Sequence, residues 1–303
     1  MIVIEDDVFE SDKLILKFSE LTRSPLVDVR INTCRLLKNV FEGFDQIDAS
    51  IYQEIQDNIG YTSTDKEAKV RANGLLALAA VSNSENEIIN KKKQFIAKYD
   101  PEVTVRVCAF RTLTARRDNI SIFLFGINDD SLAVQKLCFM RIFRDFDLQW
   151  FSEEQICTIF RSAFYSKHIK QLLSIHIPRL VCHTDNGLVS LVSHFNLRND
   201  CDFVCELLRS FYKEYHTKNR ITTIVKDFRD TYLDEKALPI QPNLSRHVIL
   251  VWKSLIEICK ELNIILTEEI SGDEENKEIE VIELDLCDML MPDLPNFLQY
   301  IRR

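Results

Sequence analysis

One short pattern occurs four times in the first half of the sequence, and it constrains the fold more than any other feature. Each copy centres on a valine, followed by arginine in three copies and glutamine in the fourth: Val29-Arg30, Val70-Arg71, Val105-Arg106 and Val134-Gln135. Serine or aspartate stands five residues before the valine, a small residue four after it, and leucine or isoleucine eight after it. The spacings of 41, 35 and 29 residues indicate one supersecondary unit used several times.

The pattern is typical of an amphipathic helix that packs against copies of itself. The valine and the aliphatic residue share one face, because eight residues make a little over two turns. The first position (Ser24, Asp65, Asp100, Asp129) is predicted to cap the helix, with Pro25 and Pro101 at the first helical position. The small residue would allow close approach of a neighbouring helix. The arginine could reach the acid of a neighbouring repeat.

Long helices with short connections also fit the scarcity of turn residues. The 303 residues include only six glycines and seven prolines, which β-rich proteins need for tight turns. We therefore predict an all-α fold, a HEAT-repeat (armadillo-type) α-solenoid of antiparallel helix pairs.

The chain is predicted to have four parts. Residues 1–235 form the solenoid, and residues 236–266 add a solenoid helix after a proline-containing linker. Residues 267–280 form an acidic, disordered linker, and residues 281–303 a short helical motif. Further helices are expected near 152–165, 167–182, 187–196, 201–215, 217–234 and 245–263, the first of them opened by a capping box at Ser152 and Gln155.

Charge is distributed unevenly along the chain. Net charge is −9, but eleven acids and one lysine lie between Glu268 and Asp293. Residues 1–267 are close to neutral, with 35 Lys/Arg and 36 Asp/Glu. Between Lys91 and Arg179 cations outnumber acids by fifteen to nine. In a solenoid, corresponding positions line one surface, so such residues could form a stripe that follows a phosphate backbone without reading bases.

We predict nucleic-acid contacts from ten of these cations. They are Lys91, Lys92, Lys93, Lys98, Arg106, Arg111, Arg116, Arg117, Arg141 and Arg144. The alternative interpretation is that these cations lie on an ordinary solvated face and form local salt bridges.

No catalytic motif is evident, and neither an enzymatic activity nor a cofactor is predicted. The glycines are isolated, which excludes a phosphate loop, and no serine lies in a nucleophile elbow. The best metal candidates lack zinc spacing and are interpreted as core residues: His176, Cys182, His183, His194, Cys201 and Cys205. Nine scattered cysteines suggest reduced thiols in a cytosolic or nuclear protein. No signal peptide or membrane span is recognised, and no membrane or small-molecule partner is expected.

Three stretches resemble the condensin non-SMC subunit 3 (chromosome-associated protein G) family. The first is residues 102–136, where the Val-Arg repeat is followed by Gly126-Ile-Asn-Asp129. The second is residues 242–262, a helix containing Leu250-Val-Trp252. The third is residues 290–301, where Leu-Met-Pro-Asp-Leu-Pro-Asn-Phe-Leu-Gln-Tyr-Ile follows the acidic segment as in the family. Family members are usually several times longer, so this chain is a reduced version or a fragment.

The resemblance implies a scaffold that binds the kleisin subunit and duplex DNA in mitotic chromosome condensation. SMC ATPase subunits would associate indirectly, through kleisin. The implied location is the nucleus and chromosomes, with the cytoplasm possible outside mitosis. The alternative hypothesis is a HEAT-repeat adaptor that binds peptide or protein partners in transport and does not bind DNA.

Overall fold

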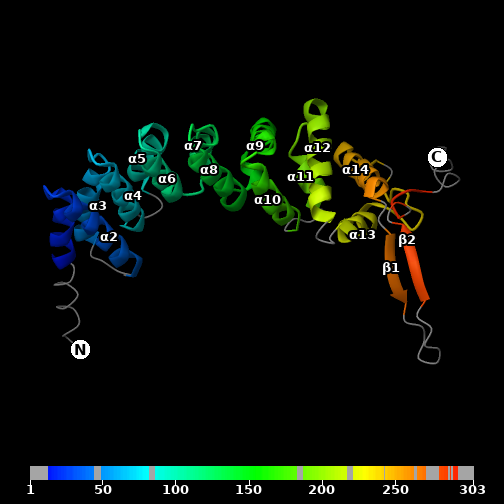
Figure 1. Ribbon diagram of the computed structural model, residues 1–303, viewed down its shortest axis with the longest axis horizontal. Helices are drawn as coiled ribbons and strands as arrows, with labels where there is room; N and C mark the ends of the chain where they lie inside the picture. Colours follow the sequence, from blue (N-terminus) through cyan, green and yellow to red (C-terminus); the bar gives the residue numbers. More distant parts are fainter. Residues whose placement is uncertain are drawn as a thin grey trace, which may run out of the picture. The chain divides into compact units, whose positions relative to one another are not determined.

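The computed structural model describes residues 13–43, 49–81, 86–182, 187–216, 221–241, 243–262, 265–270, 280–285, 287 and 289–292 (Figure 1). The chain divides into two compact units, Met1–Phe146 and Asp147–Arg303. Both are built mainly of stacked helices, which confirms the predicted all-α, HEAT-type solenoid class.

The first unit has two layers of helices. Residues 13–20 are helical and lead into the 3-10 turn η1 (Leu21–Arg23). One layer contains the helices that carry the repeated pattern: α2 (Val27–Gly43), α4 (Ala68–Val81), α6 (Val103–Thr112) and α8 (Leu132–Asp145). The other contains α3 (Ala49–Thr62), α5 (Glu87–Tyr99) and α7 (Ile120–Gly126), the last preceded by η2 (Arg117–Asn119). Figure 1 shows the alternation between the two layers.

The second unit continues the helical pattern. It contains η3 (Leu148–Trp150), α9 (Glu153–Tyr165), α10 (Lys170–Cys182), α11 (Gly187–Ser193), α12 (Leu197–His216), α13 (Ile221–Tyr232) and α14 (Arg246–Leu262). These helices confirm the predicted segments, and α9 has the capping box between Ser152 and Gln155. Edge-to-face contacts link Phe160 to Phe195 and Phe195 to Phe203 in the core.

Three arginines join successive motif helices in a regular ladder. The guanidinium of Arg30 donates to both carboxylate oxygens of Asp65, at 2.7 and 3.0 Å. Arg71 binds Asp100 at 2.7 and 2.8 Å, and Arg106 binds Asp129 at 2.8 Å twice. Each arginine thus reaches forward to the acid of the next repeat. Paired, parallel hydrogen bonds fix orientation as well as distance.

The third nitrogen of each guanidinium closes the turn before its own helix. Nη1 of Arg71 donates to the carbonyls of Asp65 and Lys66, and Arg30 and Arg106 make the equivalent bonds. In the fourth copy Gln135 keeps this bond, to the Asp129 carbonyl at 2.6 Å, but it has no guanidinium with which to bind a fourth acid. The Arg–Asp ladder ends there.

The predicted caps lie outside the helices. Helix α6 begins at Val103 and α8 at Leu132, so Asp100 and Asp129 precede their N-cap residues, Glu102 and Ser131. These acids instead accept a bond from the amide two residues later, as in an Asx turn. Pro25 and Pro101 likewise precede the first helical residue. The prediction of N-caps was wrong because the acids bind the ladder arginines.

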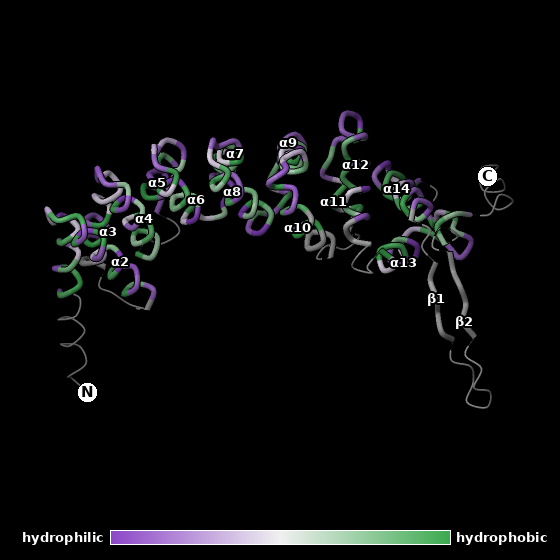
Figure 2. Tube along the Cα trace, in the orientation of Figure 1, coloured by the Kyte–Doolittle hydropathy of each residue, from purple (hydrophilic) through white to green (hydrophobic). Residues whose placement is uncertain are grey.

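The small residue of the pattern is required by close packing, as predicted. A Cβ on Gly74 would lie 1.8 Å from Oγ1 of Thr62 at the end of α3. The aliphatic positions of the pattern are buried too, apart from the half-buried Val29: they are Val70, Val105, Val134, Leu37, Leu78, Leu113 and Ile142. Figure 2 shows hydrophobic and hydrophilic residues alternating along each helix, as expected where one face is buried.

A β-hairpin follows α14, and it corrects two expectations. Strands β1 (Ile265–Ile270) and β2 (Glu280–Asp285) pair antiparallel, with Ile265 opposite Asp285 and Ile270 opposite Glu280. Residues 267–270 therefore belong to a strand rather than a linker, and residues 281–285 to a strand rather than a helix. β-branched and aliphatic residues interspersed with acids suit an extended chain. Residues 271–279 and 293–303 lie outside the described residues.

The ladder predicts a large stability effect at a middle rung. Arg71→Ala removes one partner of a pair whose side chains are only 12% and 6% exposed. Leaving Asp100 without its counter-charge should lower the free energy of unfolding by about 2–4 kcal/mol. Urea denaturation followed by circular dichroism measures the effect.

Lys136→Ala, on the exposed side of α8, is the matched control and should change stability by less than about 0.5 kcal/mol. Arg71→Lys should fall between the two, because lysine keeps the charge and loses the paired geometry. Equal stability of Arg71→Ala and the control would contradict the role given to the ladder.

Candidate nucleic-acid interface

The ten cations predicted to contact nucleic acid do not share one surface. Four belong to α5, two to the segment between α6 and α7, and four to the motif helices α6 and α8. Because α5 and the motif helices are in different layers (Figure 1), the predicted stripe is divided between the layers.

Three of the ten have structural roles. Arg106 is a rung of the ladder, and its bond to Asp129 raises the pKa of the guanidinium. Arg141 is buried and donates to the carbonyls of Phe110, Arg111 and Leu113, at the C-terminal end of α6, at 2.9 Å each. Lys93 is 7% exposed, and burial lowers its pKa to about 8. Sequence reasoning missed these roles, because a buried and an exposed cation look alike in a charge count.

The other α5 lysines border the outer surface of their layer. Lys91 forms an exposed ion pair with Glu87 one turn earlier. Lys92 donates to the carbonyl of Gly60 in α3 at 2.6 Å. Lys98 lies over the ring of Phe125, with Nζ 5.5 Å from the ring centroid. These three side chains lie on the layer opposite the motif helices.

The remaining four include two residues that belong to a common face. Arg111 is exposed on α6, and Arg144 is exposed on α8 beside Asp145, to which it donates at 2.6 Å. Arg116 pairs loosely with Asp118 at 3.6 Å, and Arg117 is exposed in the η2 turn.

The repeat register shows which positions of the motif helices face solvent. Counting from the valine of the pattern as zero, positions −1, +2 or +3, +6 and +10 recur at one helical turn, and the residues there are exposed or half-buried, apart from the buried Ile31. They hold five cations and one acid, Asp28: the cations are Arg35, Lys69, Arg111, Lys136 and Arg144. We call these six residues, with the uncharged residues between them, the motif-helix face.

The helices that carry the motif-helix face lie side by side, because α2 contacts α4, α4 contacts α6, and α6 contacts α8. Its other residues are uncharged, and most are short, such as Asn32, Ala80 and Thr104. Arg35 donates to the side chain of Asn73 on the adjacent helix at 3.1 Å, so this cation lies against its neighbour rather than far out in solvent. A low, cationic surface of this kind is suited to a regular polyanion.

Arg35, Lys69 and Lys136 were missed from the sequence. Arg35 and Lys69 lie outside the basic stretch 91–179, and Lys136 lies within it but has no cation beside it in the sequence. The signal was available in the repeat, since Arg35 and Arg111 both stand six residues after the valine.

The described residues offer little for metal chemistry. In the ranges given above, no group of three or more His, Cys, Asp and Glu side chains is placed to hold a metal ion. Cys201 and Cys205 are one turn apart on α12, and His176 is buried in α10. His183 lies outside the described residues. None of the described helices is long and apolar enough to cross a membrane.

Comparison with known proteins identifies the fold but not a sequence family. No family model matches the chain, and no curated protein matches it. In the crystal structure of the S. pombe condensin Cnd3-Cnd2 subcomplex, one chain is similar with a TM-score of 0.68 and 18% identity, over 96% of this chain and 34% of that chain. This chain therefore spans about a third of the length of that one.

Two other structures are more distant. An engineered protein has a TM-score of 0.40 at 14% identity, over 71% of this chain and 96% of its own. The karyopherin Kap121p, bound to the extreme C-terminus of the protein phosphatase Cdc14p, has a TM-score of 0.40 at 13% identity, over 83% of this chain and 30% of its own. At these TM-scores neither protein is a close structural match. The fold of this chain is similar to that of the S. pombe condensin chain.

Burial of Lys93 predicts a distinctive pH dependence. Its pKa falls from 10.5 to about 8 on folding, so the unfolded chain binds the extra proton between these values and stability rises with pH across that window. Lys93→Met removes the penalty of a buried charge and should stabilise the protein at pH 7 by on the order of 2 kcal/mol.

Urea denaturation at pH 7, 9 and 10.5 tests this expectation. The advantage of Lys93→Met over the wild type should shrink as pH rises. Lys91→Met, at an exposed neighbouring lysine, is the control and should show no such trend. A constant difference across the three pH values would mean that Lys93 is not penalised by burial.

Proposed function

We propose that this chain is a non-catalytic scaffold subunit of a condensin complex. In this role it binds the kleisin subunit and duplex DNA, without sequence specificity, in mitotic chromosome condensation. The motif-helix face is the observation that carries the DNA part of the proposal, and the fold shared with the S. pombe condensin chain over 96% of the present chain supports the setting.

The motif-helix face has dimensions suited to duplex DNA. Packed helices lie roughly 8–10 Å apart, so four of them span about 30 Å. One turn of B-DNA is about 34 Å long. Cations on successive helices would therefore meet phosphates across about one turn. Short neighbouring side chains allow the cations to approach the phosphate backbone closely, and contacts to phosphates carry no sequence information.

Partner proteins follow from the same proposal. The S. pombe structure is a complex of two subunits, Cnd3 and Cnd2. We propose a kleisin subunit as the direct partner here, with the SMC ATPase subunits associated through it. The proposed location is the nucleus and chromosomes, with cytoplasmic protein possible outside mitosis.

Charge reversal tests the DNA face. The full chain carrying Arg35→Glu, Lys69→Glu, Arg111→Glu and Lys136→Glu should lose at least about 30-fold in affinity for a 30-base-pair duplex, because several phosphate contacts become repulsive. Fluorescence anisotropy of labelled duplexes measures binding. For the wild type, affinity should fall steeply between about 50 and 200 mM salt and should differ little between unrelated sequences.

The matched control reverses three cations of the other layer, Lys91, Lys92 and Lys98. It should retain most of the affinity if the motif-helix face binds DNA. The opposite result would assign DNA to the α5 layer instead. Loss in neither variant, or no binding by the wild type, would contradict a DNA-binding role and leave the peptide-adaptor alternative.

Assembly needs a separate experiment. Tagged full-length chain, purified from cells that express it, should recover one kleisin and two SMC ATPases in stoichiometric amounts by mass spectrometry. Recovery of cargo or transport factors without SMC proteins would overturn the condensin assignment.

A further inference from the structure

A stripe of large apolar side chains lies exposed along the outer side of α5. Ile88, Phe95 and Tyr99 are 80%, 65% and 62% exposed. They stand at spacings of seven and four residues, so they line one side of three helical turns. Phe125 of α7 extends the stripe, with its ring centroid 6.5 Å from that of Tyr99, and Phe95 lies 5.1 Å from Tyr99. We call these four residues the α5 stripe.

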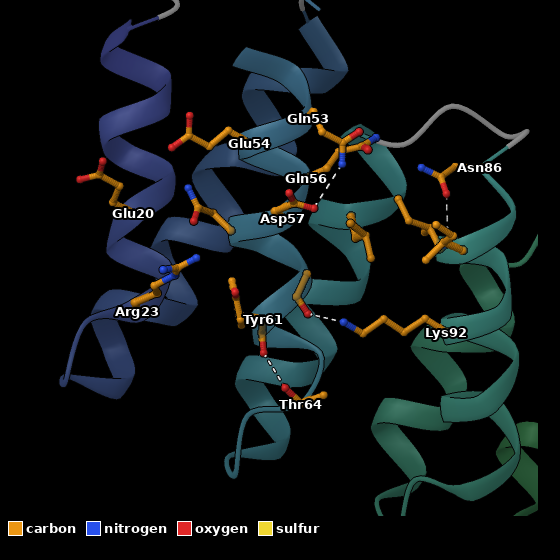
Figure 3. A pocket seen from close by; sticks show the side chains of 15 residues that line it. Glu20, Arg23, Gln53, Glu54, Gln56, Asp57, Tyr61, Thr64, Asn86 and Lys92 are labelled. Carbon is orange, nitrogen blue, oxygen red and sulfur yellow. Dashed lines mark hydrogen bonds between the residues drawn. The ribbon is translucent and has the colours of Figure 1, made fainter. Parts of the chain in front are cut away.

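Lys92 occupies the one polar position on the side of α5 that carries the stripe. It stands between Ile88 and Phe95, where an apolar residue would continue the four-three-four spacing. Its ammonium bends towards α3 and donates to the Gly60 carbonyl, near the C-terminal end of that helix (Figure 3). The aliphatic part of the side chain is left alongside the apolar residues.

A groove adjoins the N-terminal end of the α5 stripe. It has a volume of about 930 Å³ and lies between residues 20–23, α3 and α5. Tyr61 stands in it, with the Arg23 guanidinium 4.1 Å from its ring centroid (Figure 3). Glu20, Glu54 and Asp57 line the same groove, and these acids would repel a phosphate backbone and an acidic peptide alike, so the groove bounds the α5 stripe.

We propose that the α5 stripe binds an amphipathic helix of a partner protein, with acidic residues flanking its apolar face. Large apolar side chains that are exposed and adjoin one another, as Phe95, Tyr99 and Phe125 do, form the kind of surface that marks a protein contact. The spacing of Ile88, Lys92, Phe95 and Tyr99 matches the seam along which two helices pack. Charge selects the occupant, because Lys92 and Lys98 flank the stripe while Lys91 is paired with the single acid of α5, Glu87.

This surface is separate from the proposed DNA face. It belongs to the α3–α5–α7 layer, whereas Arg35, Lys69, Arg111 and Lys136 belong to the motif helices. The inference rests on the proposed scaffold function for its biological setting, but its test needs neither DNA nor condensin subunits. Failure of the DNA-binding proposal therefore does not imply failure of this inference, and the reverse also holds.

Selection from a phage-displayed library of random 16-residue peptides tests the inference. Full-length wild-type chain is the bait, and Phe95→Glu/Tyr99→Glu is used for counter-selection. Both substituted residues are exposed, so the variant should keep its circular dichroism spectrum and unfolding midpoint. Enriched peptides should have apolar residues at helical spacing and acidic flanks, and the most enriched should bind the variant at least 10-fold more weakly in fluorescence anisotropy.

Further variants and ligands distinguish an acidic helix from other occupants of the α5 stripe. Ile240→Glu, an exposed aliphatic position in the second unit, is the matched control and should bind as the wild type does. Lys92→Glu/Lys98→Glu should weaken acidic peptides by several-fold. Enrichment of basic peptides, no difference between bait and variant, or stronger binding of labelled oligo-dT than of any peptide would overturn the proposal. So would a dimer in sedimentation velocity that Phe95→Glu/Tyr99→Glu abolishes, since a second copy would then occupy the α5 stripe.

Discussion

The paired hydrogen bonds between arginine and aspartate set the geometry of the first unit. Each rung joins two consecutive motif helices at their N-terminal turns and, through the third guanidinium nitrogen, closes the turn of its own helix. One side chain thereby fixes both a loop and the spacing between repeats. Burial opposes ionisation of Asp65, but bonds from Arg30 and the Glu67 amide outweigh it and lower the pKa of its carboxyl group. The charged side chains of the Arg–Asp ladder are therefore bonded to one another within the fold.

Because these charges are bonded within the fold, the density of cations along the sequence does not show which cations lie on the surface. Arg106 and Arg141 lie in the most basic part of the sequence, yet one completes the ladder and the other binds the last carbonyls of α6. Cations that remain for a partner occupy other positions of the same repeat. A repeated arrangement allows residues far apart in the sequence, such as Arg35 and Lys136, to share one face with Arg111, because stacking brings equivalent positions together.

The two layers of the first unit offer different chemistry. The motif helices present mostly short residues and cations, whereas the outer layer presents aromatic residues, aliphatic residues and lysines. A scaffold that holds a polyanion on one layer and a protein segment on the other can bind both at once. This division depends only on helices stacking in register, and it requires no catalytic group.

The sequence by itself determined the fold class, the repeat and the positions that pack. Val70, Gly74 and Leu78 could be assigned to a buried face from spacing alone, because helical periodicity fixes which residues share a side. Helices such as α9 were also predictable, since the Ser152 capping box is a local signal. The burial of Lys93, the bond from Lys92 to Gly60 and the strands at 265–270 and 280–285 were decided by tertiary structure. Each depends on a neighbour distant in sequence, and short-range pattern contains no information about that neighbour.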